Sequence, residues 1–135
     1  MHYIKTEFMD CSRLNVWRRT EVHALFMNNI DKFQLIHEVD KYLFSHAGVY
    51  LEWTKKYEIT LRELFDFKKF LGGRWNTLED VSYTRGGWCK VGSCVWADIR
   101  ESVENEFPVM FKRQIVGHTK CKKSLILLLR LPVLM

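Results

Sequence analysis

Apolar residues near the start of the chain recur at helical spacing. They predict a helix over residues 20–32, for which Thr20 is a favourable N-cap. The members of its apolar face are Val22, Leu25, Phe26, Ile30 and Phe33. This pattern is typical of a helix that packs through one side.

Two strand-like runs follow, at residues 33–39 and 42–46. Asp40 and Lys41 separate the runs and predict a tight hairpin. The first run has a mixed pattern, whereas the second is almost entirely apolar. An apolar run of this kind is typical of a central strand that is covered on both faces.

The middle of the chain predicts further helices. Residues 49–56 indicate a short helix, and Thr60 with Glu63 forms a capping-box pattern that opens a second helix. The second helix is expected to stop at Gly72 and Gly73, because glycine commonly ends helices. Residues 74–90 are expected to form a loop.

The last third of the chain predicts two short strands. Residues 92–98 (Gly-Ser-Cys-Val-Trp-Ala-Asp) indicate a turn followed by a strand, and residues 114–117 indicate another strand. Residues 100–107 are polar and indicate a loop or a short helix. Residues 121–135 form an atypical apolar tail, which is too short for a bilayer span of about 20 residues. We interpret this tail as a buried strand or an aberrant terminus.

These elements predict a single α+β domain over residues 1–135, with no internal repeat and no linker. Hydrophobic residues make up 47% and aromatic residues 14% of the chain, which supplies a core and excludes an intrinsically disordered protein. The net charge of +5 is scattered along the sequence. It is compatible with an anionic partner and does not demand nucleic acid.

Four cysteines occur, at Cys11, Cys89, Cys94 and Cys121. Four residues separate Cys89 from Cys94, which is not a common zinc-knuckle spacing, and no second close pair exists. We therefore expect reduced thiols and a cytoplasmic location. The first residues do not show the pattern of a signal peptide, and no membrane association is expected.

Two histidines end apolar strands and are followed or preceded by glycine. His46 leads to Gly48, while His118 lies between Gly117 and Thr119. A neutral imidazole is a good ligand for zinc, iron or manganese, and glycine lets a substrate approach closely. Both histidines are predicted to lie at one edge of the same sheet and to bind metal. The alternative is that both are hydrogen-bonded core histidines.

Arg85 and Asp98 are further candidates. Arg85 precedes two glycines, so its planar guanidinium can reach a phosphate that the glycines admit. The alternative is a solvated loop arginine. Asp98 either orients a ligand imidazole or, as we favour, serves as a turn residue or helix cap.

Three segments together resemble the calcineurin-like metallophosphoesterases, especially the serine/threonine protein phosphatase-like branch of bacteria and phages. They are residues 42–49 (Tyr-Leu-Phe-Ser-His-Ala-Gly-Val), residues 92–98 and residues 115–119 (Ile-Val-Gly-His-Thr), in a matching order and spacing. The resemblance covers residues 20–120, and the three motifs are more specific together than singly.

The resemblance implies a fold of two sheets flanked by helices and an active site with two manganese, iron or zinc ions. These ions activate a bridging water for attack on the phosphorus of a phosphorylated substrate. By this resemblance His46 and His118 are metal ligands, and Arg85 is the substrate-binding arginine. Gly48, Gly117, Thr119 and Asp98 would then support these residues.

Three motifs of the family do not occur in the sequence: Gly-Asp-x-His-Gly, Gly-Asp-x-x-Asp-Arg-Gly and Gly-Asn-His-Glu/Asp. They supply the remaining ligands and the catalytic histidine, so no catalytic residue is assigned. We therefore expect a partial metallophosphoesterase fold, the C-terminal half of a β-sandwich flanked by helices. Such a half holds metal weakly and is inactive alone. It also exposes an apolar edge or face, which predicts self-association or pairing with a complementary N-terminal fragment.

Two other interpretations remain open. The chain can be a non-catalytic module that docks a phosphorylated ligand through Arg85 or a partner chain through the apolar tail. It can also be an unrelated small α+β domain with satisfied core histidines.

Overall fold

The computed structural model describes residues 16–103 and 113–119, which form two compact units that divide between Phe33 and Gln34. Each unit is described by itself, and the single-domain prediction stays a prediction. The tail over residues 121–135, together with Cys11 and Cys121, lies outside the described residues.

The first unit contains the predicted helix. A 3₁₀ turn, η1 (Val16–Arg18), leads into α1 (Arg19–Asn28), and a second 3₁₀ turn, η2 (Ile30–Lys32), follows. The predicted N-cap is wrong, because the helix already begins at Arg19 and Thr20 lies inside it. Within the predicted apolar face Ile30 is buried, whereas Leu25 is exposed.

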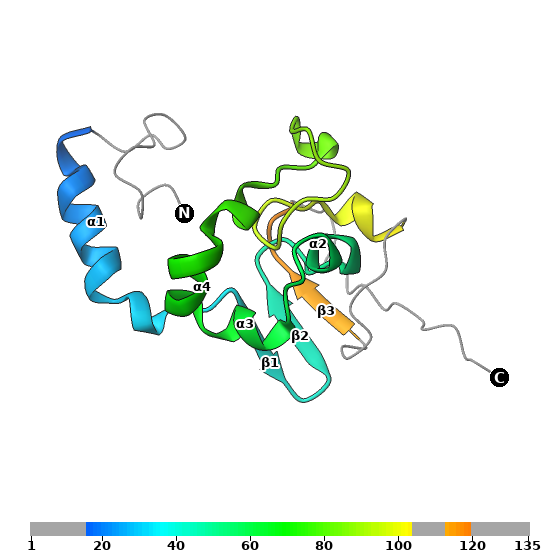
Figure 1. Ribbon diagram of the computed structural model, residues 1–135, viewed down its shortest axis with the longest axis horizontal. Helices are drawn as coiled ribbons and strands as arrows, with labels where there is room; N and C mark the ends of the chain where they lie inside the picture. Colours follow the sequence, from blue (N-terminus) through cyan, green and yellow to red (C-terminus); the bar gives the residue numbers. More distant parts are fainter. Residues whose placement is uncertain (1–15, 104–112, 120–135) are drawn as a thin grey trace. The chain divides into compact units, whose positions relative to one another are not determined.

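The second unit is built on a three-stranded sheet with the order β1-β2-β3 (Figure 1). The predicted hairpin is confirmed, because β1 (Ile36–Val39) pairs antiparallel with β2 (Tyr42–Ser45) across Asp40 and Lys41. Asp40 takes a positive φ of 53°, a conformation that aspartate tolerates and that tight hairpins require. The third strand, β3 (Arg113–Val116), lies parallel to β2 on its other side.

The prediction that the central strand is covered on both faces is wrong. Leu43 on β2 has an exposed fraction of 0%, whereas the next side chain, Phe44, is 37% exposed. Successive strand residues point to opposite faces. One face of the sheet therefore belongs to the core, and the other face is open within the described residues.

Three short helices follow the hairpin in sequence: α2 (Leu51–Lys56), α3 (Leu61–Phe65) and α4 (Phe67–Arg74). The predicted capping box is confirmed, with the Thr60 backbone N–H donating to Glu63 Oε2 at 2.7 Å. The predicted stop at Gly72 and Gly73 is wrong. The chain breaks earlier at Asp66, whose carboxylate caps α4 by accepting from the Lys69 backbone, and α4 continues through both glycines.

Side chains of this part of the chain form the core beside the sheet. Its largest fully buried members are Tyr50, Trp53, Leu64 and Leu78, together with Ile36, Leu43 and Val49. The Trp53 indole is buried with its polar atom satisfied, because its Nε1–H donates to the Thr77 carbonyl at 2.9 Å. Figure 1 shows α3 beside β1, the strand that it contacts.

Residues after α4 form tight turns where a loop and a strand were predicted. The 3₁₀ turns η3 (Trp75–Glu79), η4 (Tyr83–Arg85) and η5 (Ile99–Val103) occur here. The predicted strand within residues 92–98 is wrong, because the Trp96 and Ala97 backbone N–H groups both donate to the Ser93 carbonyl and close a turn. The expected short helix at residues 100–107 corresponds to η5 as far as the described residues extend.

A search of the described residues finds no helix that is both long and apolar enough to cross a membrane.

Candidate functional site

The structure brings the two predicted histidines together. His118 Nδ1 lies 2.6 Å from His46 Nε2, and the two rings meet edge to face with their centroids 4.5 Å apart. The Trp96 ring flanks His118 at a centroid distance of 6.0 Å. The expectation that both residues lie at one edge of the sheet is therefore confirmed, while their metal role stays a prediction. We refer to His46 and His118 as the histidine pair.

The backbone places this pair. Because β2 and β3 are parallel neighbours, their C-terminal ends lie at the same edge of the sheet, and Ser45 is the register partner of Val116. The pairing continues past the strand ends, where the His46 carbonyl accepts from the N–H groups of Gly117 at 3.1 Å and His118 at 2.9 Å. The two imidazoles thus leave the sheet from adjacent positions.

Gln114 secures the same edge, and sequence reasoning missed it. Its side chain is buried, donates to the Val49 carbonyl at 2.7 Å and accepts from the Val49 N–H at 2.8 Å. The side-chain amide of Gln114 therefore pairs with the Val49 backbone as the backbone of a neighbouring strand would. The available signal was a polar residue at the start of an apolar run.

The environment favours neutral rings in the pair. Burial lowers the pKa of both His46 and His118 below the usual value, and the positive charge of Arg85 lowers both further. For His118, the negative charge of the Asp98 carboxylate and the backbone of Val95 act to raise the pKa without reversing the shift. Two neutral nitrogens that face each other cannot both present lone pairs, so either one proton or a cation belongs between them.

The two nitrogens of the pair lie closer together than two nitrogens bound to one zinc ion. With metal–nitrogen distances of 2.0–2.1 Å and tetrahedral angles, two bound nitrogens lie about 3.3 Å apart. The rings would therefore have to separate by about 0.7 Å to bind one zinc ion together. Over residues 16–103 and 113–119 no group of three or more His, Cys, Asp or Glu side chains is placed to hold a metal ion. The pair is thus a two-ligand arrangement within this part of the chain.

Arg85 lies against the loop that follows β3. Its Nη2 donates to Thr119 Oγ1 at 2.6 Å, and its Nε lies 3.0 Å from Asp98 Oδ2. The Nε contact is an ion pair without the direction of a hydrogen bond, since the buried Nε has no hydrogen-bond partner among the described residues. Arg85 is 23% exposed, so the alternative of a solvated loop arginine is wrong.

The Asp98 carboxylate forms ion pairs with two arginines, Arg85 and Arg100. Arg100 donates to Asp98 Oδ1 from its backbone at 3.0 Å and from Nε at 2.8 Å, while Arg85 approaches from the other side. The hydrogen bonds from Arg100 keep the pKa of the buried Asp98 carboxyl below its ordinary value although burial acts to raise it. The favoured interpretation as a turn residue is confirmed by the bond to the Arg100 backbone, and the ion pair with Arg85 adds a second role.

Arg100 and Glu101 were also missed by sequence reasoning. Glu101 is buried and accepts from the Asp98 N–H and the Thr84 hydroxyl. We call Arg85, Asp98, Arg100 and Glu101 the arginine cluster. The alternation of charges at residues 98–101 (Asp-Ile-Arg-Glu) was the available signal, but in sequence it is indistinguishable from an exposed polar turn.

The two predicted glycines differ. Gly48 has a φ of +112°, and a Cβ there would meet the Tyr50 ring at 3.0 Å, so the turn after His46 requires glycine. Gly117 has no positive φ, and no described atom lies within 4 Å of its would-be Cβ. The backbone conformation at Gly117 therefore does not itself require glycine.

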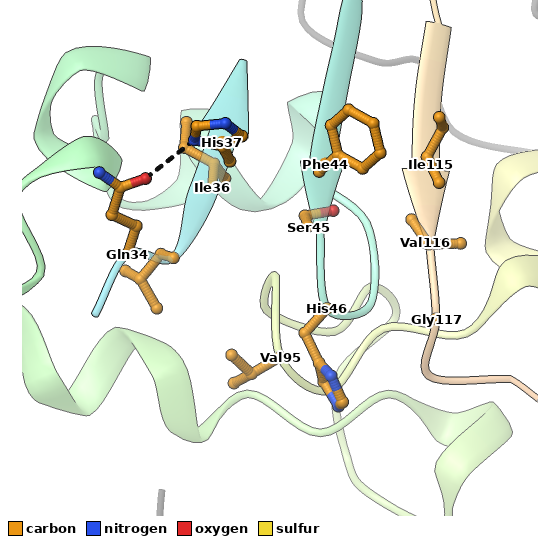
Figure 2. A pocket seen from close by; sticks show the side chains of 11 residues that line it. Gln34, Ile36, His37, Phe44, Ser45, His46, Val95, Ile115, Val116 and Gly117 are labelled. Atoms are coloured by element: carbon orange, nitrogen blue, oxygen red, sulfur yellow. Dashed lines mark hydrogen bonds between the residues drawn. The ribbon is translucent and has the colours of Figure 1, made fainter. Parts of the chain in front are cut away.

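A hollow of about 450 Å³ opens beside His46 on the sheet. Figure 2 shows Phe44 and Ile115 toward one end of this hollow and His46 with Val95 toward the other. His37 also lines it and is hydrogen-bonded to Gln34 at 3.1 Å, away from the histidine pair. The hollow joins the open face of the sheet to the candidate site.

No protein-family model, no curated protein and no solved structure matches this chain. Any assignment of function therefore depends on the site itself.

Proposed function

We propose that this chain is a portion of a calcineurin-like metallophosphoesterase, a metal-dependent hydrolase of phosphomonoesters or phosphoproteins. The observation that carries the proposal is the 2.6 Å approach of His118 Nδ1 to His46 Nε2. Neutral imidazoles that converge at the ends of adjacent strands are suited to a divalent ion such as Mn²⁺, Fe²⁺ or Zn²⁺. In this proposal, the ion supplies the activation of water.

The side chains of this chain have separate roles in the proposed site. The histidine pair would hold the ion through the two facing ring nitrogens, His118 Nδ1 and His46 Nε2. Arg85 binds the phosphoryl oxygens, because its fork is close to the pair and already oriented by Thr119. Asp98 would hold Arg85 through their ion pair, whereas its effect on His118 is that of a nearby charge and not of a hydrogen bond.

The proposed half-site explains the open face of the sheet. Phe44 and Val39 are 37% and 46% exposed on neighbouring strands, which is what a sheet would show if a second layer belonged against it. We therefore include in the proposal the finer fold assignment, half of a β-sandwich, and a complementary fragment or second copy as the partner. A strictly monomeric chain at high concentration that binds no such fragment would argue against this part.

Calorimetric titration with Mn²⁺ and Zn²⁺ tests the metal role. His46→Ala and His118→Ala are each expected to lower the affinity at least about tenfold, as loss of one of two ligands should. His37→Ala is the matched control, because His37 lies on the same sheet but contacts Gln34. Unchanged metal binding in both pair variants would refute the proposal.

Turnover of a generic phosphomonoester on the same samples tests activity. We expect little or none from this chain alone, since two ligands do not hold two ions. Metal-dependent turnover that disappears with His118→Ala would instead mean that the site is completed, for example in an oligomer.

A second candidate function is a non-catalytic module that docks a phosphorylated ligand. The arginine cluster favours it, because the contacts of Arg85 with Asp98 and Thr119 leave guanidinium N–H groups available for a phosphate oxygen. This module would bind phosphate without any effect of metal ions. Phosphate affinity that is equal with and without Mn²⁺ would favour it over the phosphoesterase.

For both candidate functions we propose a cytoplasmic location. The two described cysteines, Cys89 and Cys94, are free thiols, which supports this location.

A further inference from the structure

Glu101 uses both oxygens of a buried carboxylate to join three segments of the chain. Oε1 accepts from the Asp98 backbone N–H at 2.6 Å and from Thr84 Oγ1 at 3.0 Å, while Oε2 accepts from the Gly92 backbone N–H at 2.9 Å. The residue is only 4% exposed. A carboxylate is costly to bury without such donors, so its position depends on all three bonds.

Thr84, the residue before Arg85, is held at two points by the segment that contains Glu101. Its hydroxyl donates to Glu101, and its carbonyl accepts from Arg100 Nη2 at 3.0 Å. Its own element, η4, is a single 3₁₀ turn followed by Gly86 in the left-handed conformation. A turn this short does not fix its own direction, so contacts from outside it determine where Arg85 points.

Arg85 is consequently held along its whole length. Its backbone N–H donates to the Ser82 carbonyl at 3.0 Å, the preceding Thr84 is bonded to Glu101 and Arg100, Asp98 lies against Nε, and Thr119 accepts from Nη2. A guanidinium has five N–H groups in a rigid fork. Among the described residues, none accepts a hydrogen bond from Arg85 Nη1. The N–H groups of Nη1 are therefore available to bind an oxyanion.

We propose that Glu101 is a positioning residue that pre-organises Arg85 for a phosphoryl dianion, an inference that rests on the phosphate role of Arg85 in the proposed function. Glu101 does not touch the ligand. It acts by holding Thr84 and the Asp98 backbone together, so that Arg85 loses little freedom when phosphate binds. Without Glu101, both contacts of Arg85 loosen at once.

The test measures binding of inorganic phosphate to the full chain by calorimetry, together with labelling of Arg85 by phenylglyoxal and peptide mapping. Glu101→Gln is expected to weaken phosphate binding about tenfold and to speed the labelling of Arg85, because an amide cannot accept all three hydrogen bonds. Thr84→Val, which removes one hydroxyl from an exposed residue, is expected to act in the same direction but less strongly. Thr84→Ser keeps the hydroxyl and should retain wild-type affinity.

Two comparisons separate positioning from a general loss of structure. Glu38→Gln removes the same charge from an exposed position on β1 and should leave both readouts unchanged. The effects of Thr84→Val and Glu101→Gln on phosphate affinity should be less than additive in the double variant, because both changes break the same hydrogen bond between Thr84 and Glu101. If Glu101→Gln does not fold, the Thr84 variants decide the outcome.

The outcomes distinguish the two proposals. Wild-type phosphate affinity in folded Glu101→Gln and Thr84→Val, with binding lost in Arg85→Lys, would overturn the positioning role and leave the phosphate role of Arg85 intact. A wild-type chain that binds no phosphate would overturn both roles of the cluster. The metal titration of the histidine pair would remain a separate test of the phosphoesterase assignment.

Discussion

The histidine pair and the arginine cluster lie at the same end of the sheet but are held in different ways. The pair is placed by backbone hydrogen bonds to the His46 carbonyl, and its rings meet in a single nitrogen–nitrogen contact. In the cluster, side chains bind side chains, and the two carboxylates at its centre are buried. The arginine cluster is thus held by several side-chain contacts, whereas the histidine pair has one. Under the proposed function, the phosphate half of the site would be pre-formed and the metal half would need further ligands.

Asp98→Asn should produce the largest change in stability. Removing the charge leaves Arg85 without its buried partner, and loss of one member of such a pair costs about 3 kcal/mol of unfolding free energy. Urea unfolding of the variant measures this loss. Asp40→Asn makes the same chemical change at an exposed turn where asparagine is equally tolerated, so its stability should match the wild type. Equal stabilities of both variants would contradict the description of the cluster as a rigid unit.

Gln114→Leu should destabilise the edge of the sheet that lies beside both the histidine pair and the arginine cluster. The side chain keeps its approximate volume, but the Val49 N–H and carbonyl lose their partners, at a cost of about 2 kcal/mol. Urea unfolding again gives the value, and a metal titration shows whether the position of His46 depends on Gln114. A stability within error of the wild type would mean that water satisfies the Val49 groups equally well.

Acid should weaken the cluster through Asp98. The pKa of Asp98 is lowered in the folded chain, chiefly by Arg100, so the stabilisation is complete above the unfolded-state value of about 4 and disappears as pH falls through the folded value. The difference in Tm between wild type and Asp98→Asn should therefore be constant near neutral pH and shrink below about pH 4. If the Tm difference between wild type and Asp98→Asn stays constant down to pH 3, the destabilisation by the substitution would come from changed packing or hydrogen bonding and not from the lost charge.

His118→Ala should have the smallest effect on stability, about 1 kcal/mol or less, because the ring is only partly buried and its backbone bonds remain. The same variant is expected to lose metal binding. A large loss of stability without any change in metal binding would instead identify the pair as a structural contact of the core.

The hairpin and the capping box could be predicted because each depends on neighbouring residues alone. Asp40 and Lys41 define a two-residue turn, and Glu63 reaches back to Thr60 within one helical turn. That His46 and His118 lie at one edge of the sheet could be anticipated because each follows an apolar strand, whereas the parallel pairing of these strands was not predicted.

The features that could not be predicted depend on distant contacts. Residues 92–98 have the composition of a strand, but Gly92 lies so close to Ala97 that only a compact turn fits; a Cβ on Gly92 would be 2.6 Å from the Ala97 nitrogen. Gly72 and Gly73 resemble a helix stop, yet α4 continues through them after a new start at Asp66. The roles of Arg100 and Glu101 depend on which loops face them, and one sequence does not contain that information.

The parallel pairing of β2 with β3 also has a consequence for the order of folding. The β1–β2 hairpin closes across two residues and can form within microseconds, whereas Tyr42 must find Arg113 across 71 positions of chain. The histidine pair cannot exist before this late encounter. Protection of the Gly117 and His118 amides from hydrogen exchange should therefore develop after that of the hairpin, so that the candidate site reports the completion of folding.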